Sequence, residues 1–302
     1  MKTKLLPFLE ALFAVIVWGA SFIATKIAVG QISPIAVVFI RFAMGIPILL
    51  FAVIIRKQFA FPKGNEWGYF ALLGFLGISF HQWLQSNGLQ TAQATTTAWI
   101  VSTSPAFIAI LGWMVLKEKL NLLQSSGIVL AMIGVLAVVS KGDLSTLVGG
   151  KFGTTGDFLI LISSVNWAVF SILSRRGLKN HPSTRMTFWV MTIGWLITAV
   201  AFFANKSYTE IPLLDARGWM AMIFLGIFTT GLAYICLLYT SDAADERSSV
   251  DLGGRRIIKK KNVATSEGPC ITNIHVVLMR LGGILFMYFT NRVTEMSESH
   301  VT

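Results

Sequence analysis

The stretch LLPFLEALFAVIVWGASFIATKIAVG, from Leu5 to Gly30, is an apolar run long enough to cross a lipid bilayer. Trp18-Gly19-Ala20-Ser21 interrupts it near its middle. A related stretch, GDFLILISSVNWAVFSILSRRG, returns about 150 residues later, from Gly156 to Gly177. Trp18 and Trp167 occupy equivalent places in the two stretches. This recurrence predicts a membrane protein that contains two copies of one unit.

The composition is typical of a protein that resides in lipid. Of the 302 residues, 54% are hydrophobic and only 13% are charged, whereas a soluble domain carries about a quarter charged residues. The mean hydropathy is +0.69, and several apolar runs reach the roughly 20 residues that span a bilayer. Because lipid offers the backbone no hydrogen bonds, such runs must be helices.

Eight segments have the length and apolarity of membrane-spanning helices. They are residues 6–27, 34–55, 67–87, 94–115, 121–140, 157–174, 183–204 and 216–236. The first run continues past Ile23 and further spans follow directly, so we expect an uncleaved helix and not a signal peptide. Pro34, at the start of the second segment, suits the first turn of a helix.

Basic residues between the segments predict the orientation. With a cytoplasmic N-terminus, the inner side receives Lys2, Lys4, Arg56, Lys57, Lys63, Lys117, Lys119, Arg175, Arg176, Lys179 and Arg185, and the outer side receives Lys26, Lys141, Lys151, Lys206 and Arg217. Lys and Arg in short loops favour the cytoplasm. We therefore expect a multi-pass protein of the cell inner (plasma) membrane with its N-terminus in the cytoplasm. The net charge of +11 then indicates topology and anionic lipid headgroups rather than nucleic acid.

Four pairs of landmarks recur at nearly one offset. Trp18 matches Trp167 at 149 residues, Pro34 matches Pro182 at 148, and Trp67 and Gly74 match Trp219 and Gly226 at 152. The unit between them holds five spans, and because five is odd the second copy must run through the membrane in the opposite sense. The sequence thus predicts an all-α integral membrane fold with an inverted five-plus-five helix repeat, an arrangement typical of secondary transporters.

The region after Ile235 departs from this pattern. A ninth span should begin near residue 246, but charged residues there are too costly for a bilayer interior. We interpret residues 236–261 as read-through of a sequencing adapter, with a genuine hydrophilic cytoplasmic loop as the alternative, and residues 262–302 as a tail of uncertain origin. The expected domains are a first repeat at 1–142 and a second repeat at 153–235, truncated in its third helix, with about eight spans present and the ninth and tenth lost.

Several short motifs appear in a characteristic order over some 230 residues. They are Trp18-Gly19-Ala20-Ser21-Phe22, Arg41-Phe42, Ser104-Pro105-Ala106-Phe107 leading to Lys117-Glu118, Gly127 with Gly134, Gly156-Asp157, Trp167-Ala168 and Leu225-Gly226. With these motifs, residues 6–235 resemble the EamA-type transporters of the drug/metabolite transporter superfamily. The resemblance implies ten helices in an inverted repeat that exports or imports small metabolites without a cofactor.

Arg41 is the strongest candidate for substrate binding. It lies about seven residues into the second span, where an ionisable group is expensive and usually faces an interior cavity. Aligned through Pro34 and Pro182, its counterpart in the second copy is Trp189, and this asymmetry favours a functional role. The planar guanidinium can hold a carboxylate or a phosphate. Alternatively, Arg41 extends to the outer headgroups or pairs with a helix C-terminus.

Polar and aromatic residues in other spans complete the candidate substrate site. His81, Gln82 and Gln85 lie in the third span, with His81 and Gln85 on one helix face; a proton-carrying His81 and a purely structural one are both open. Trp18 and Trp167 lie in mid-membrane and provide cavity walls or helix packing. Ser21, Asn166 and Ser102 add polar groups, although serine also serves to pack helices. Pro105 permits a bend in the fourth span.

These features predict a secondary-active transporter of a small organic metabolite, such as an amino acid or a drug-like compound, which works by alternating access; export is expected from the family. The rival class is a non-transporting membrane scaffold or partner-binding subunit. No Gly-rich phosphate loop, metal-spaced His/Cys set or nucleophile elbow is present, so we expect neither an enzyme nor a cofactor or metal. The expected partners are the substrate and the bilayer, with a homodimer left open.

Overall fold

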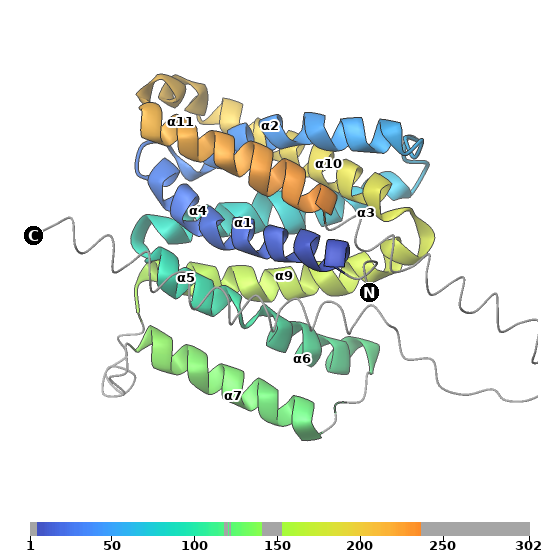
Figure 1. Cartoon of the computed structure of the whole chain (residues 1–302), viewed down its shortest axis with the longest axis vertical. Coiled ribbons are helices and arrows are strands. Elements are labelled where there is room, and N and C mark those ends of the chain that lie inside the picture. Colours follow the sequence, from blue (N-terminus) through green and yellow to red (C-terminus); the bar gives the residue numbers. More distant parts are fainter. Residues whose placement is uncertain (1–4, 118–119, 121, 141–152, 237–302) are drawn as a thin grey trace, which may run out of the picture.

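The computed structural model describes residues 5–117, 120, 122–140 and 153–236, and every regular element among them is helical (Figure 1). The first repeat holds α1 (Leu5–Val29), α2 (Pro34–Ile55), α3 (Glu66–Gly74), η2 (Phe75–Phe80), α4 (His81–Thr91), α5 (Ala94–Val101), α6 (Ser104–Leu116) and α7 (Leu122–Val139). The second repeat holds α9 (Thr155–Asn180), α10 (Ser183–Ala204), η3 (Ser207–Leu213), α11 (Ala216–Ile223) and η4 (Phe224–Leu232). Apart from Cys236, the proposed adapter segment and the tail lie outside the described residues.

All eight predicted segments are helical, but they are not equally suited to lipid. Six helices are long and apolar enough to cross a membrane: Leu12–Val29, Pro34–Ile55, Ala94–Leu116, Thr155–Asn180, Ser183–Ala204 and Ala216–Cys236. The apolar part of α7, Gln124–Ala137, is shorter. The third span fails on composition, because α4 reads HQWLQSNGLQT. A helix this polar must be shielded by its neighbours, and it packs closely against α9.

Local capping chemistry sets several helix ends. Ser33 caps α2 by accepting a hydrogen bond from Ala36 N, and Pro34 is the first helical residue, as predicted. The fourth span is interrupted after Val101, and α6 restarts at Ser104 with Pro105 in its first turn. The break agrees with the bend expected at this proline. Proline suits the first turn of a helix, but without an N–H it cannot donate the hydrogen bond that would continue α5.

The two repeats contact each other through mirrored glycines. A Cβ on Gly45 of α2 would lie 2.5 Å from Thr230 Cγ2 in η4, and a Cβ on Gly194 of α10 would lie 2.6 Å from Ile78 Cβ in η2. Gly194 follows Gly45 by 149 residues and Thr230 follows Ile78 by 152. The second helix of each repeat therefore packs on the third helix of the other, as an inverted repeat requires. The third helix comprises α3, η2 and α4 in the first repeat, and α11 and η4 in the second.

This mirrored contact corrects the register of the second helices by one residue. Pro34 is the first residue of α2, whereas Pro182 precedes α10 as its N-cap residue. Alignment through these prolines is therefore one residue out, and the counterpart of Arg41 is Val190 rather than Trp189.

Polar contacts join the repeats at one end of the bundle. The Nε of Arg185, near the start of α10, donates to the carbonyl oxygen of Ala60 at 3.0 Å. Its Nη2 donates to the carbonyl oxygen of Phe61 and pairs with the Glu66 carboxylate, also at 3.0 Å. The segment between α2 and α3 thus holds the N-terminus of α10, and His181 lies at the same end, 3.8 Å from Glu66.

The same arrangement recurs at the opposite end with the repeats exchanged. Gln31, before α2, donates to Asp215 Oδ1 at 2.8 Å and accepts from the Asp215 backbone N–H at 3.1 Å. The Nζ of Lys26 donates to the carbonyl oxygen of Ala92 at 2.7 Å. The segment between α10 and α11 therefore holds the start of α2, and Ala92 lies at this end of the bundle.

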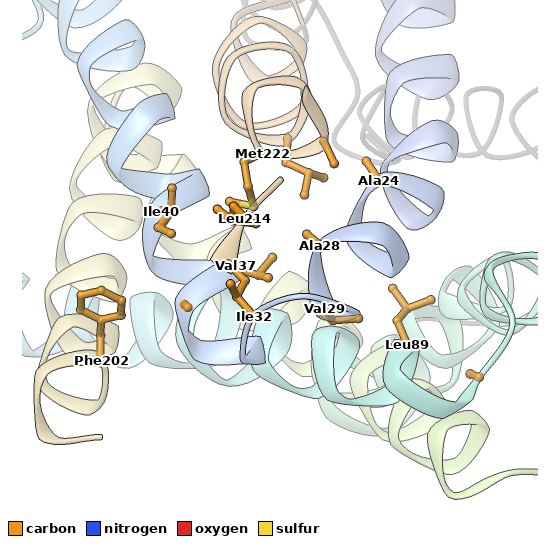
Figure 2. Close-up of a cluster of buried hydrophobic side chains, with 14 of the residues drawn as sticks. Ala24, Ala28, Val29, Ile32, Val37, Ile40, Leu89, Phe202, Leu214 and Met222 are labelled. Carbon is orange, nitrogen blue, oxygen red and sulfur yellow. The ribbon is translucent and has the colours of Figure 1, made fainter. Parts of the chain in front are cut away.

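Apolar side chains fill the space between these polar ends. Figure 2 shows one buried cluster, in which Ala24 and Ala28 of α1 face Leu214 and Met222 of the second repeat. By contrast, α7 lies at the edge of the bundle (Figure 1), and Leu122 and Leu130 are largely exposed. A Cβ on Gly127 or Gly134 would meet nothing within 4 Å, so neither glycine makes a close helix contact with the described residues.

Candidate functional site

Arg41 lies on α2, and only 5% of its surface is exposed. Its Nε donates a hydrogen bond to Thr230 Oγ1 at 3.2 Å, and its Nη1 donates to Gln82 Oε1 at 3.0 Å. Its guanidinium carbon lies 5.4 Å from the centre of the Phe42 ring. Arg41 and Gln82, two predicted site residues, are thus in direct contact, and Thr230 joins them to the second repeat.

The guanidinium of Arg41 is a buried positive charge with neutral partners. Among the described residues, no carboxylate forms an ion pair with it. An arginine has five N–H groups, and the two hydrogen bonds above leave three without an acceptor in the described part of the chain. The side chain does not extend to the surface, as the headgroup alternative would require. An uncompensated buried charge is costly, so this position demands an explanation.

His81 begins α4, directly after η2. Its Nδ1 lies 3.1 Å from the carbonyl oxygen of Ser163, so we assign the proton of the neutral ring to Nδ1, which donates to this carbonyl. Nε2 then remains as an acceptor. The ring centroid lies 4.8 Å from that of Trp167. His81 and Trp167, both predicted, therefore lie against each other where α4 meets α9.

Asn166, the residue before Trp167, links two helices in this structure. Its Nδ2 donates to the carbonyl oxygen of Leu76 in η2 at 2.7 Å. The segment η2 is π-helical, and π-helical turns inside α-helices are frequent at functional sites. Asn166 therefore holds the segment that directly precedes His81 and Gln82.

Trp18 and Ser21 lie on α1 near the end of the second repeat. The Trp18 ring meets the Tyr234 ring edge-on, with centroids 5.6 Å apart. The Ser21 hydroxyl donates to the carbonyl oxygen of Trp18 at 2.6 Å, so its proton is used within α1. Trp18 thus packs against an aromatic residue of the second repeat, while Ser21 offers only its acceptor lone pairs.

Ser102 and Gln85 are less closely tied to the other candidates. Ser102 is exposed in the break between α5 and α6, where its hydroxyl donates to the carbonyl oxygen of Ala98 at 2.8 Å. Gln85 is half-buried on α4, and its side chain makes no hydrogen bond within the described ranges. No contact of either residue joins it to Arg41 or His81.

Sequence reasoning missed Thr230 and Tyr234. Both lie in Ala216–Cys236, the last described span, which the sequence predicts to be a helix truncated after Ile235. Thr229-Thr230 is a polar pair within the apolar run FLGIFTTGLAY, a signal that could have revealed Thr230. Its segment, η4, is also π-helical and occupies the place in the second repeat that η2 occupies in the first. Neither π-helical segment has a local sequence signature that would have identified it.

Comparison with known proteins extends along most of the chain. Residues 6–140 and 154–242 match the model of the EamA-like transporter family. An uncharacterized transporter from Archaeoglobus fulgidus is 27% identical over 247 residues, which cover 82% of each chain. The uncharacterized transporter YyaM of Bacillus subtilis is 30% identical over 222 residues, or 72% of this chain and 71% of the relative.

A solved crystal structure resembles this chain with a TM-score of 0.51 and 18% sequence identity, covering 95% of this chain and 98% of the other. A likeness at this identity supports the fold alone. The family match supports more, because it covers well over half of the chain and includes both repeats. With its all-helical, inverted-repeat fold, this multi-pass membrane protein belongs to the EamA-like transporter family.

Proposed function

We propose that this protein is a secondary-active transporter that moves a small organic metabolite across the membrane by alternating access. The observation that carries the proposal is the pair of hydrogen bonds from Arg41 to Gln82 and to Thr230, which joins the two repeats through buried polar groups. Charged groups at bilayer depth usually mark a solute pathway. In transporters with inverted repeats, the substrate lies near the midplane between the halves.

The surrounding residues suit an amphipathic solute such as an amino acid or a drug-like compound. Trp18 and Trp167 present flat apolar surfaces, and Nε2 of His81 offers a hydrogen-bond acceptor. We assign substrate contact to these residues and to Arg41 and Gln82. We assign a supporting role to Asn166, because its amide is occupied by the Leu76 carbonyl.

Flux measurements on proteoliposomes test the proposal. The purified full chain is reconstituted, loaded with unlabelled L-leucine, L-phenylalanine or L-threonine, and assayed for uptake of the labelled amino acid by counterflow. We expect uptake above that of empty liposomes, lost on Arg41→Ala and on His81→Ala. The control is Ser102→Ala, because Ser102 is exposed and bonded within its own helix segment, so flux should persist.

The rival function, a non-transporting scaffold or partner-binding subunit, makes a different prediction. If the protein is a scaffold or a partner-binding subunit, the wild-type protein should show no counterflow of any solute. If flux persists in both Arg41→Ala and His81→Ala, the transport function stands, but the substrate must bind away from these two residues.

We further propose that the protein exports its substrate and resides in the cell inner (plasma) membrane with its N-terminus in the cytoplasm. The basic residues around Arg56 and Arg185 support this orientation, because they gather at one end of the bundle. Single cysteines at Gln93 and Asn180, both exposed, test it in a variant whose native cysteines are replaced by serine. An impermeant thiol reagent added to intact cells should label position 93 and spare position 180; the reverse labelling would contradict the orientation.

A further inference from the structure

The junction between the repeats is built twice, and α2 and α10 occupy the same place in the two copies. A Cβ on Gly226 would lie 3.2 Å from the carbonyl oxygen of Arg41, and a Cβ on Gly74 would lie 2.7 Å from the carbonyl oxygen of Val190. Gly226 follows Gly74 by 152 residues, and Val190 follows Arg41 by 149. These are the offsets that relate the repeats, so Val190 is the structural counterpart of Arg41.

The residues that pack opposite Arg41 and Val190 also differ in polarity. Thr230 accepts the hydrogen bond of Arg41, and its counterpart, 152 residues earlier, is Ile78. Ile78 and Val190 are both buried and belong to one hydrophobic cluster. The same junction is therefore polar and charged in one copy and apolar in the other.

An apolar pair is thus sufficient to build the contact. Replacing buried ionic groups by hydrophobic residues of similar volume is often neutral or stabilising, because the groups no longer have to be desolvated. The junction at Val190 packs without a charge, so we expect that the junction at Arg41 can pack without one as well. The charge therefore has a role that an aliphatic side chain cannot perform.

We propose that Arg41 is the subsite for a carboxylate on the transported metabolite, and that the substrates are small organic acids or zwitterions with one carboxylate. This inference rests on the proposed transport function. The three N–H groups of Arg41 without a described acceptor can bind both carboxylate oxygens, a geometry that the planar guanidinium favours. Gln82 and Thr230 hold the guanidinium in place without neutralising it.

The charge balance at the site favours a monoanionic group over a phosphate. No second Lys or Arg within the described ranges hydrogen-bonds to Gln82 or Thr230, and Lys26, near the end of α1, donates to the backbone carbonyls of Gln90 and Ala92 at the end of α4. A dianion would leave one negative charge without a partner inside the protein, which is costly. One carboxylate matches the one cation that the described residues place at this site.

The repeat supplies the variant that tests this subsite. Arg41→Val combined with Thr230→Ile gives the first junction the composition of the second. The full chain is purified in detergent, and its thermal unfolding is followed with L-leucine, L-phenylalanine and 3-phenylpropanoate, each compared with its primary amide. The amides keep the size and apolar groups of the acids but lack the negative charge.

In the wild-type protein, we expect at least one acid to raise the unfolding temperature more than its amide does. The double variant should unfold no earlier than the wild type and bind that acid about tenfold to hundredfold more weakly, the range expected for loss of a charge-assisted hydrogen bond. Arg41→Lys should retain part of the preference for the acid, because the charge remains while the planar fork is lost.

Three results would overturn the proposal: no acid of the panel binds better than its amide, the double variant keeps the preference, or the double variant fails to fold. The last would show that the apolar pair cannot replace the polar one. Acid binding without counterflow would refute the transport function and leave the carboxylate subsite intact. Equal flux of acids and amides would refute the subsite and leave transport intact.

Discussion

Replacing Gly194 with alanine tests the mirrored contact between the repeats. The new Cβ would lie 2.5 Å from the carbonyl oxygen of Gly74 and 2.6 Å from Ile78 Cβ. Ordinary contact begins near 3.4 Å, so α10 and the third helix would have to separate by about 0.9 Å, the difference between 3.4 and 2.5 Å. Overpacking costs about 1–3 kcal/mol. We expect about 3 kcal/mol, because the closest atom belongs to backbone that no rotamer change can move.

Thermal unfolding of the purified full chain in detergent measures this cost. At roughly 2–4 °C per kcal/mol for a chain of this size, Gly194→Ala should lower the unfolding temperature by roughly 6–12 °C. The control is Gly127→Ala on α7, where the Cβ meets nothing within 4 Å. That variant should gain roughly 0.5–1 kcal/mol, because alanine favours a helix over glycine. Equal unfolding temperatures for the two variants would refute the close contact of α10 with the third helix.

Three further predictions concern the ends of the helices. Arg185→Ala removes the hydrogen bonds to the carbonyls of Ala60 and Phe61 and the ion pair with Glu66, so it should lower the free energy of unfolding by about 1–3 kcal/mol. The control is Lys179→Ala, which should change stability little because Lys179 is exposed. Equal unfolding temperatures for the two variants would contradict the role of Arg185. The backbone N–H of Lys63 donates to the Glu66 carboxylate and lowers its pKa from the ordinary value of 4.5. The contribution of the ionised carboxylate to folding stability is therefore complete above about pH 4.5 and is lost as the pH falls through the lowered pKa. Wild type and Glu66→Gln should therefore converge in unfolding temperature on acidification, and a constant difference would count against it. Thr154→Ala removes the capping box of α9 and should cost about 1 kcal/mol, measured in the same assay; no loss would contradict the cap.

The helices and their order could be predicted because long apolar runs leave no other backbone structure in lipid. The segments 34–55 and 183–204 match α2 and α10 residue for residue. The repeat was equally visible, since Trp18, Gly74 and their counterparts recur at a nearly constant offset. Apolar length and spacing are local properties, so a sequence reveals them directly.

The contacts of the site could be predicted only in part. Arg41 and Gln82 were candidates because ionisable and amide groups are rare within membrane spans, and they prove to be bonded to each other. Thr230 was missed because threonine is common in such spans, and its role depends on Arg41, which lies 189 residues away in the chain. The one-residue shift that pairs Arg41 with Val190 comes from how α2 and α10 start, and proline spacing alone cannot reveal it.

The π-helical turns of η2 have a consequence for the spacing of the chain. Each residue of an α-helix advances the side chains by about 100° around the axis, and a π-helical turn holds an additional residue. Deleting one residue between Phe75 and Phe80 would remove this additional residue and leave an ordinary α-helical turn, with His81 and Gln82 at nearly the same angle around the axis. Deleting one residue of α3 would instead rotate α4 by about 100° relative to the start of the span. The chain should therefore tolerate the loss of one codon better within η2 than within α3.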